Sequence, residues 1–292
     1  MSAQRNAEFI EVSKPAPKVT KILLNRPKQR NAQSYQLLYE LNDAFSDAAH
    51  DDSTSVIILA AEGPDFSAGH DLKDTQQLDT LRDRGPVGVW GGYESAGAEG
   101  RMAMEKEVYI GFCERWRSIP KPTIAQVHGR VIAGGLMLVW PCDIIIASDD
   151  AKFQDNTGAM GVCGVEFFNH PWELGVRKAK EMLFTADYIS AADAKALGMV
   201  NHVVARADLE RFTLDLALRI AAKPSFALRM IKEAVNGAQD VQGRLAAQNA
   251  SFALHQLCHA HNISLHGALV DMNGVAETVR KNNPRFASVP NT

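Results

Sequence analysis

The chain has 292 residues, and its 31 basic and 34 acidic side chains give a formal net charge of −3. Apolar residues make up 46% and charged residues 22%, which excludes disorder as the main state and is typical of a soluble globular enzyme. The near balance of charge, with no Lys/Arg-rich block, argues against a nucleic-acid-binding protein. The length predicts one large domain or a domain with an appendage.

The cysteines and the apolar stretches indicate the compartment. No Cys-x-x-Cys spacing occurs, so no zinc pattern forms, and we expect reduced, mostly buried thiols in an intracellular protein. The four thiols are Cys113, Cys142, Cys163 and Cys258. The N-terminal segment has no apolar signal core, and the longest apolar stretch, Val131–Cys142, is broken by glycines and Pro141. We therefore expect a cytoplasmic protein without a membrane span.

The first part of the chain predicts a strand, a helix and a second strand. Val19–Leu24 and Val56–Ala60 are short and β-branched, whereas Ser34–His50 carries apolar residues at helical spacing. A strand–helix–strand order at this distance favours a parallel sheet.

A second unit of the same kind follows. Thr123–Val127 predicts a strand, Gly129–Gly135 is a glycine-rich segment, and an apolar helix is expected to end near Pro141. Ile144–Ala147 predicts a further buried strand. The fold class predicted by these units is therefore α/β.

From about Trp172 onward the pattern is mostly helical. Ser190 is a candidate N-cap, Gly198 is expected to end that helix, and Val200–Val204 predicts one last strand. Pro224 is expected to lie at or near the first turn of another helix. Long helices are then predicted over Gln242–His261 and Leu265–Lys281.

The segment Thr80–Gly100 fits neither pattern, because it holds seven glycines and prolines together with several charges. One interpretation is a flexible surface loop. The other is a lid or a substrate-shaping insertion, because long loops in compact domains are often functional.

Two glycine-containing turns follow predicted strands: Phe66–Leu72 comes after the second strand, and His128–Gly135 comes after the third. Small residues let a ligand approach the backbone, and each turn could offer one N–H to the same oxygen. Such a pair is an oxyanion hole, which stabilises a thioester enolate or a tetrahedral oxyanion. Spacing alone favours the simpler interpretation that the glycines only permit tight turns.

Five motifs in a fixed order resemble the crotonase superfamily, the enoyl-CoA hydratase/isomerase family, over about residues 18–286. They are Leu24-Asn25-Arg26-Pro27 with Asn31-Ala32, then Phe66–Leu72, then Lys121–Ala125 through Gly134-Gly135 to Cys142-Asp143-Ile144, then Leu183-Phe184-Thr185 with Ser190–Ala194 and Gly198–Asn201, and finally Pro284-Arg285-Phe286.

The resemblance implies a ββα spiral core over residues 1–205 and a helical C-terminal trimerisation region over residues 206–292. It also implies a coenzyme A thioester as the substrate, no cofactor, no metal, and a homotrimer or a dimer of trimers. The oxyanion donors carry over to the backbone N–H groups of His70 and Gly134. The positions implied for coenzyme A binding are Arg30, Ala68, Asp71, Leu72 and Lys281.

Two positions depart from the family's hydratases, which hold water between two glutamates. Here those positions are Met137 and Thr157, and neither side chain can act as a general base on water at neutral pH. The usual machinery for syn-hydration is therefore missing.

Glu166 is the best candidate to replace these glutamates, because several non-hydratase branches place a working carboxylate just after the glycine that aligns with Gly161. Its neighbours Val165, Phe167 and Phe168 are apolar, which predicts a raised pKa and a role in moving protons. The alternative is a surface glutamate at the start of a helix.

The histidines are weaker candidates. We expect the imidazole of His70 to pack outside the site, although family members with Gly-His-Asp at this turn include decarboxylases of acyl-CoAs with an extra carboxylate. His170 and Trp172 predict a helix start and a core anchor. The tail contains His255, His259 and His261, near Cys258. We expect these histidines to face the core, the trimer interface or solvent rather than to bind a metal.

The sequence therefore predicts an acyl-CoA enzyme of the hydratase/isomerase type, within fatty-acid (lipid) metabolism, with Glu166 as the proton carrier. Hydrolysis and decarboxylation remain open, and so does a non-catalytic acyl-CoA-binding or assembly subunit. A nucleotide-binding oxidoreductase is rejected, because Gly129–Gly135 lacks the Gly-x-Gly-x-x-Gly pattern.

Overall fold

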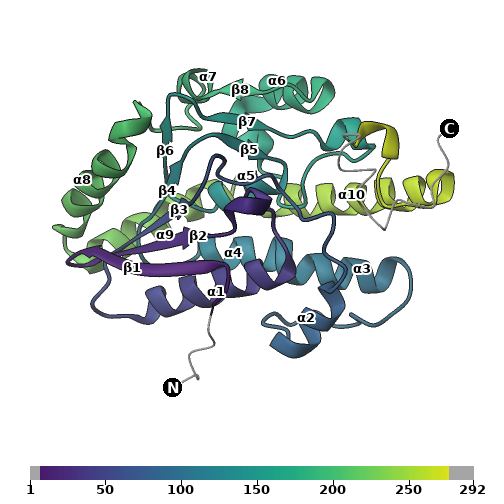
Figure 1. The fold of residues 1–292 in the computed structure, drawn as a ribbon, viewed down its shortest axis with the longest axis horizontal. Coiled ribbons are helices and arrows are strands. Elements are labelled where there is room, and N and C mark those ends of the chain that lie inside the picture. Colours follow the sequence, from purple (N-terminus) through teal and green to yellow (C-terminus); the bar gives the residue numbers. More distant parts are fainter. Residues whose placement is uncertain (1–6, 276–292) are drawn as a thin grey trace.

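The computed structural model describes residues 7–275, which form an α/β fold around a six-stranded sheet (Figure 1). The strand order is β1-β2-β3-β4-β6-β9, and all neighbours are parallel except β1 and β2. The strands are β1 (Ile10–Ala16), β2 (Val19–Leu24), β3 (Val56–Ala61), β4 (Thr123–Val127), β6 (Ile144–Ser148) and β9 (His202–Val204). The predicted parallel sheet is confirmed, and only the antiparallel strand β1 was not foreseen.

A smaller sheet of order β5-β7-β8 lies beside the first, next to the helices α6 and α7 (Figure 1). Its strands are β5 (Arg130–Ile132), β7 (Lys152–Gln154) and β8 (Ile189–Ser190). Strand β5 lies within the glycine-rich segment 129–135, so that segment begins as a strand and only then becomes a helix.

The helices surround both sheets. They are α1 (Tyr35–His50), α2 (Gln77–Arg84), α3 (Ala98–Glu105), α4 (Phe112–Arg117), α5 (Gly134–Val139), α6 (His170–Thr185), α7 (Ala191–Ala196), α8 (Leu209–Ala221), α9 (Ser225–Asp240) and α10 (Arg244–His266). A π-helix, Lys106–Gly111, joins α3 to α4, and single 3-10 turns occupy Pro27–Gln29, Thr157–Met160, Arg206–Asp208 and Met272–Gly274.

Two apolar clusters hold the layers together on opposite faces of the main sheet. On one face α1 and α4 pack on the sheet through Leu41, Phe45 and Trp116. On the other face α8 packs on β3 and β4 through Leu209 and Ala217. Because α8 covers the core sheet, the region after residue 205 shares packing with the core, and the boundary at 205/206 stays a prediction.

The start of one helix agrees with the sequence, and the end of another does not. The hydroxyl of Ser190 accepts the N–H of Asp193 and caps α7, as predicted. In the tail, α10 ends at Gly267, which has a φ of +67° and closes the helix in a left-handed conformation. A long helix over Leu265–Lys281 is therefore wrong for the described residues, where only a 3-10 turn follows.

The segment Thr80–Gly100 is also more ordered than a loop. Its first residues end α2 and its last residues begin α3, which leaves residues 85–97 as the connection. The buried carboxylate of Glu107 accepts the N–H groups of Val87 and Gly88, the latter at 2.9 Å. The π-helix therefore anchors the insertion to the body of the molecule.

Candidate active site

The two glycine-containing turns lie side by side because β3 and β4 are neighbours and parallel, so their carboxyl ends meet at one edge of the sheet. Backbone hydrogen bonds join the turns directly. The N–H of Phe66 donates to the carbonyl of His128 at 3.0 Å, and the N–H of Ile132 donates to the carbonyl of Ser67 at 3.0 Å. The sequence prediction that the two turns approach each other therefore matches the geometry.

Glycine is required where the turns touch. Gly69 has a φ of +87°, and a Cβ there would lie 2.7 Å from the carbonyl oxygen of Ile132 and 3.3 Å from the N atom of Gly134. A Cβ on Gly134 would lie 2.5 Å from the imidazole of His70. The His70 turn and the first residue of α5 are therefore in contact, and the first amides of a helix have no acceptor within it.

Ala133, directly before Gly134, has a φ of +45°, which is unusual for a residue with a side chain. Such a conformation costs roughly 1–3 kcal/mol and persists only where neighbours hold it. Here the N–H of Ala133 donates to the carbonyl of Gln154 on β7 at 2.8 Å. The small sheet thus fixes the turn that begins α5.

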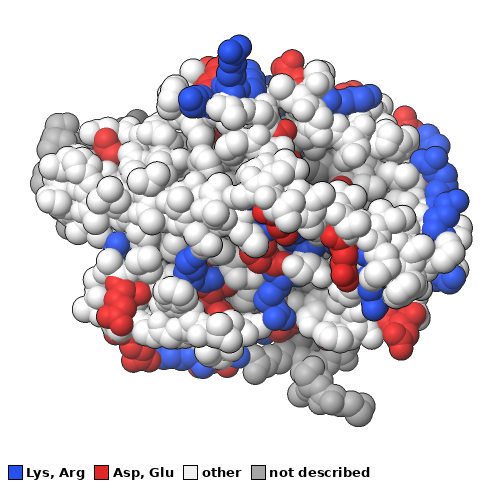
Figure 2. Space-filling model, turned by 180° about the vertical axis from the view of Figure 1, so that it is seen from behind, with Lys and Arg blue, Asp and Glu red and all other residues white. Residues whose placement is uncertain are grey.

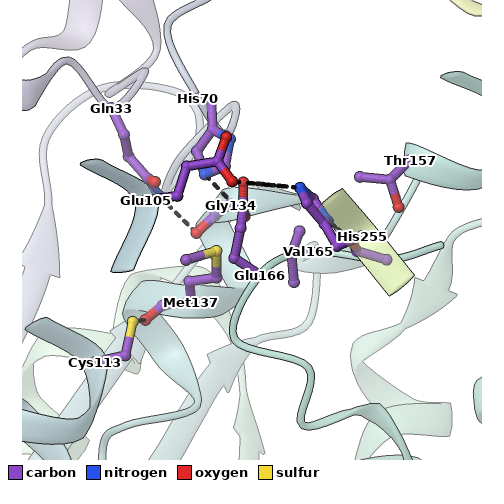
Figure 3. A network of polar contacts seen from close by, with 12 residues as sticks. Gln33, His70, Glu105, Cys113, Gly134, Met137, Thr157, Val165, Glu166 and His255 are labelled. Atoms are coloured by element: carbon purple, nitrogen blue, oxygen red, sulfur yellow. Dashed lines mark hydrogen bonds and ion pairs between the residues drawn. The ribbon is translucent and has the colours of Figure 1, made fainter. Parts of the chain in front are cut away.

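Gln33, which the sequence analysis did not single out, ties the two turns together. Its N–H donates to the carbonyl of Gly69 at 2.8 Å, and its carbonyl accepts the N–H of Asp71 at 3.0 Å. Its side-chain Nε2 donates to the carbonyl of Gly134 at 2.6 Å (Figure 3). The only sequence signal was its place directly after the Asn31-Ala32 motif.

Glu166 points into this site rather than to solvent (Figure 3). The residue is only 4% exposed, and its Oε2 lies 3.7 Å from the Nε2 of His70. Its Oε1 lies 3.4 Å from the Nε2 of His255. The alternative of a surface glutamate at the start of a helix is therefore wrong, and α6 begins only at His170.

The sequence predicts a raised pKa for Glu166, and the structure gives the opposite direction. Burial alone would raise the pKa of this carboxyl, but the charged imidazole of His255 beside it and a backbone hydrogen bond hold it below its usual value. The apolar neighbours at 165, 167 and 168 are visible in the sequence, whereas the imidazoles come from segments far away in the chain. Glu166 is therefore an ionised carboxylate at neutral pH.

The sequence predicts that the imidazole of His70 packs outside the site. In the structure the ring instead lies within the site. The ring stacks on Tyr109 of the π-helix, with centroids 4.2 Å apart, and its Nε2 faces Glu166. Burial lowers the pKa of His70 against the opposing effect of Glu166, so the ring is neutral. The positive charge that faces Glu166 is therefore carried by His255.

The sequence predicts that His255 faces the core, the trimer interface or solvent, and in the structure it is buried beside Glu166. Burial lowers its pKa, but Glu166 and Glu105 outweigh that effect and raise the pKa to about 9. His259 is also buried, whereas His261 is exposed. The spacing of His255 and His259 by four residues on one helix was the available signal, since it places both rings on one face.

Met137 and Thr157 offer no carboxylate here. Met137 is buried in the core, where its carbonyl accepts the thiol of Cys113 at 3.2 Å. The hydroxyl of Thr157 donates to Asp155 at 2.6 Å. That same carboxylate, through its other oxygen, lies 2.8 Å from the Nε2 of fully buried His170, which thus serves as a structural anchor at the start of α6.

The residues implied for coenzyme A binding line the rim of the first turn. The N–H of Ala68 donates to the carbonyl of Arg30, and the Arg30 guanidinium lies 3.4 Å from Asp65. Asp71 is paired with Arg26 at 2.7 Å, and Leu72 packs against a small apolar cluster near the C-terminus. Lys281 lies outside the described residues.

The surface charge and the helices concern two predictions from the sequence, that the chain does not bind nucleic acids and does not span a membrane. On the face shown in Figure 2, basic and acidic side chains are interspersed among neutral ones. Within residues 7–275, every helix is too short or too polar to cross a bilayer.

Comparison with known proteins gives a consistent result. The family described as enoyl-CoA hydratase/isomerase matches residues 16–86 and 94–284, and the gap falls within the insertion. EchA13 from Mycobacterium tuberculosis, named as a candidate enoyl-CoA hydratase, is 47% identical over 248 residues, which are 84% of this chain and 78% of that protein.

Two further relatives show the breadth of the family. A crystal structure of an enoyl-CoA hydratase candidate from Mycobacterium smegmatis superposes with a TM-score of 0.81 at 45% identity, covering 90% of this chain and 99% of that one. The 4-chlorobenzoyl coenzyme A dehalogenase-2 of an Arthrobacter species is 29% identical over 219 residues, 74% of each chain. The chain therefore belongs to the enoyl-CoA hydratase/isomerase family, within the crotonase superfamily.

Proposed function

We propose that this protein is an acyl-CoA enzyme that forms a thioester enolate and moves a proton on it. The backbone N–H groups of His70 and Gly134 polarise the thioester carbonyl, and Glu166 carries the proton. The observation that carries the proposal is the buried Glu166 carboxylate, 3.7 Å from the His70 ring at the junction of the two turns.

The chemistry follows from these groups. Glu166 takes a proton from the carbon chain of the thioester, and the electron pair moves onto the carbonyl oxygen, where two N–H donors stabilise the oxyanion. Return of the proton to a second carbon of a conjugated system completes a double-bond isomerisation. Because Glu166 is ionised at neutral pH, it begins the cycle as the base.

Hydration is less well supported than isomerisation or another proton transfer, because positions 137 and 157 carry Met and Thr. Hydration needs a group that activates water, and one carboxylate would have to serve both the water and the α-carbon. Hydrolysis and decarboxylation share the polarised thioester and remain alternatives. The name of the dehalogenase relative indicates that the family includes other acyl-CoA reactions.

We assign the binding of coenzyme A to the rim of the first turn, at Arg30, Ala68, Asp71 and Leu72, and the family resemblance adds Lys281 as a basic group. The proposed proton transfer requires no cofactor. We also propose a homotrimer or a dimer of trimers, supported by large apolar side chains that α9 and α10 expose; these are Phe226, Ile231, Val235, Leu254 and Leu257. Light scattering on the purified protein tests that assembly.

The experiment is exchange of carbon-bound protons in D₂O with a panel of acyl-CoA thioesters, read by mass spectrometry, together with loss of crotonyl-CoA absorbance. The panel includes thioesters with a second carboxylate. Glu166→Gln should slow exchange by about 10²–10⁴-fold, the usual contribution of a positioned acid–base group. Glu181→Gln, a surface variant paired only with Lys178, is the control.

Two results would contradict the proposal. Exchange that persists in Glu166→Gln would remove that carboxylate from the chemistry. If no thioester exchanges but several still raise the melting temperature, the protein is a binding or assembly subunit.

A further inference from the structure

A second group of ligand-type side chains lies behind Glu166, where α3 packs against α10. Glu105 is the last residue of α3, and His255 and His259 lie one turn apart on α10. The Nε2 of His255 is 4.0 Å from one Glu105 oxygen, and the Nε2 of His259 is 3.7 Å from the other. All three residues are buried, and one ligand atom from each lies within 4.8 Å of the others.

Both rings are oriented with Nε2 inward. The Nδ1 of His255 lies 2.8 Å from the carbonyl of Gly164, and the Nδ1 of His259 lies 2.7 Å from the carbonyl of Leu269. A carbonyl only accepts, so each Nδ1 carries a proton and donates it. In a neutral ring, each Nε2 is then a bare lone pair, and metal-ligating histidines commonly show this same arrangement.

The carboxylate is oriented as well. The side-chain amide of Gln256 donates to Glu105, and the guanidinium of Arg101 in turn donates to Gln256 at 2.9 Å. These outer contacts restrict the orientation of the Glu105 carboxylate. The Nε2 of His255 has no hydrogen-bond partner although it is fully enclosed.

The Nε2 lone pairs of His255 and His259 face the carboxylate oxygens of Glu105, so the cluster needs positive charge between these acceptors. Burial and Glu166 raise the pKa of Glu105 to about 8, whereas burial and His255 lower the pKa of His259 to about 4. With His255 charged and Glu105 protonated, two protons balance Glu105 and Glu166. One divalent cation would replace both protons at the same total charge.

We propose that Glu105, His255 and His259 form a binding site for a divalent transition-metal ion, of which Zn²⁺ is the best match to two imidazoles and one carboxylate. Zinc binds these donors at about 2.0–2.2 Å in a tetrahedron, which places the ligand atoms about 3.4 Å apart, so they need to approach one another by up to about 1.4 Å. Glu166 borders the site through His255, at 3.4 Å. The ion would clamp α3 to α10 behind the proposed reactive carboxylate.

The test uses the full-length protein after dialysis against a chelator, titrated with Zn²⁺ by calorimetry and with Co²⁺ by visible absorbance. The site predicts one ion per chain and the strong visible bands of tetrahedral Co²⁺. Because the ligand atoms must lose their protons before they bind the ion, affinity should rise with pH. A bound ion should also raise the melting temperature.

The variants make the assignment specific. His259→Gln, His255→Gln and Glu105→Gln should each weaken Zn²⁺ binding by at least about 100-fold. His261→Gln, an exposed histidine on the same helix, should bind as the wild type does. Circular dichroism checks that each variant remains folded.

Three outcomes would overturn the site. One is no uptake of either ion up to about 1 mM. Another is unchanged binding in His259→Gln and His255→Gln. The third is an intense thiolate band with Co²⁺, which would place the ion at Cys258 instead.

Discussion

The two turns at the sheet edge and the carboxylate–imidazole cluster behind them are built in opposite ways. The turns each consist of one contiguous motif, and the parallel pairing of β3 with β4 brings them together. The cluster takes Glu105, Glu166 and His255 from three segments that are far apart in the chain. Backbone function can therefore be recognised in short motifs, whereas the charge state of a buried side chain depends on contacts that no motif contains.

The largest expected effect is at the point where the turns touch. Gly69→Ala should destabilise the protein by about 1–3 kcal/mol, because the new Cβ meets the Ile132 carbonyl at a positive φ. The displaced donors should also lower proton exchange by about 100-fold. Gly237→Ala, with open space around it on α9, should instead stabilise by about 0.5–1 kcal/mol. Denaturant unfolding of both variants checks the contrast, and equal effects would contradict it.

The cluster of Glu105, Glu166 and His255 should control the pH dependence of the proposed proton transfer. Removing the charged ring in His255→Gln should raise the pKa of Glu166, because an opposite charge at this distance lowers a carboxyl pKa by about 1–3 units. The acidic limb of the kcat/KM profile should move upward by that amount. An unmoved limb, with His261→Gln as the reference, would show that His255 does not set the charge of Glu166.

The cluster should also weaken the fold at alkaline pH. The pKa of Glu105, about 8, and that of His255, about 9, both lie above their unfolded values, so their contribution to stability is lost as pH rises through these values. Between pH 6.5 and 9, with chelator present, the wild-type melting temperature should fall by at least about 2 °C more than that of Glu105→Gln. Parallel curves would argue against a protonated Glu105.

The smallest expected effect concerns the insertion. Glu107→Gln replaces one acceptor oxygen with a donor that faces the N–H groups of Val87 and Gly88, so residues 85–97 should loosen. Limited proteolysis within that segment should accelerate, while the melting shift caused by a coenzyme A thioester stays the same. Unchanged cleavage would show that Glu107 does not hold the insertion.

The sequence predicted much of the fold because the signals were local. The strand Thr123–Val127 and the cap at Ser190 match the structure residue for residue. The helix expected over Leu265–Lys281 failed because apolar periodicity was weighed without Gly267, whose left-handed conformation ends α10. The glycines of Thr80–Gly100 predict a loop or a lid, whereas the structure places the ends of two short helices, α2 and α3, within that segment.

For the site, the sequence singled out the two turns that meet at the edge of the sheet but not what surrounds Glu166, and the binding of a thioester oxygen by their N–H groups stays a prediction. The pKa expected for Glu166 had the wrong direction, because the charged ring of His255 outweighs the apolar sequence neighbours of Glu166. The π-helix that presents Tyr109 to His70 also has no clear sequence signal, although such helices are common at functional sites.

The most direct test of the central claim is a crystal structure of Glu166→Gln bound to crotonyl-CoA. We predict that the thioester oxygen lies about 2.7–3.1 Å from the N atoms of both His70 and Gly134, with the carbon chain beside residue 166. A thioester oxygen that contacts neither amide, or an acyl chain directed away from residue 166, would contradict the account.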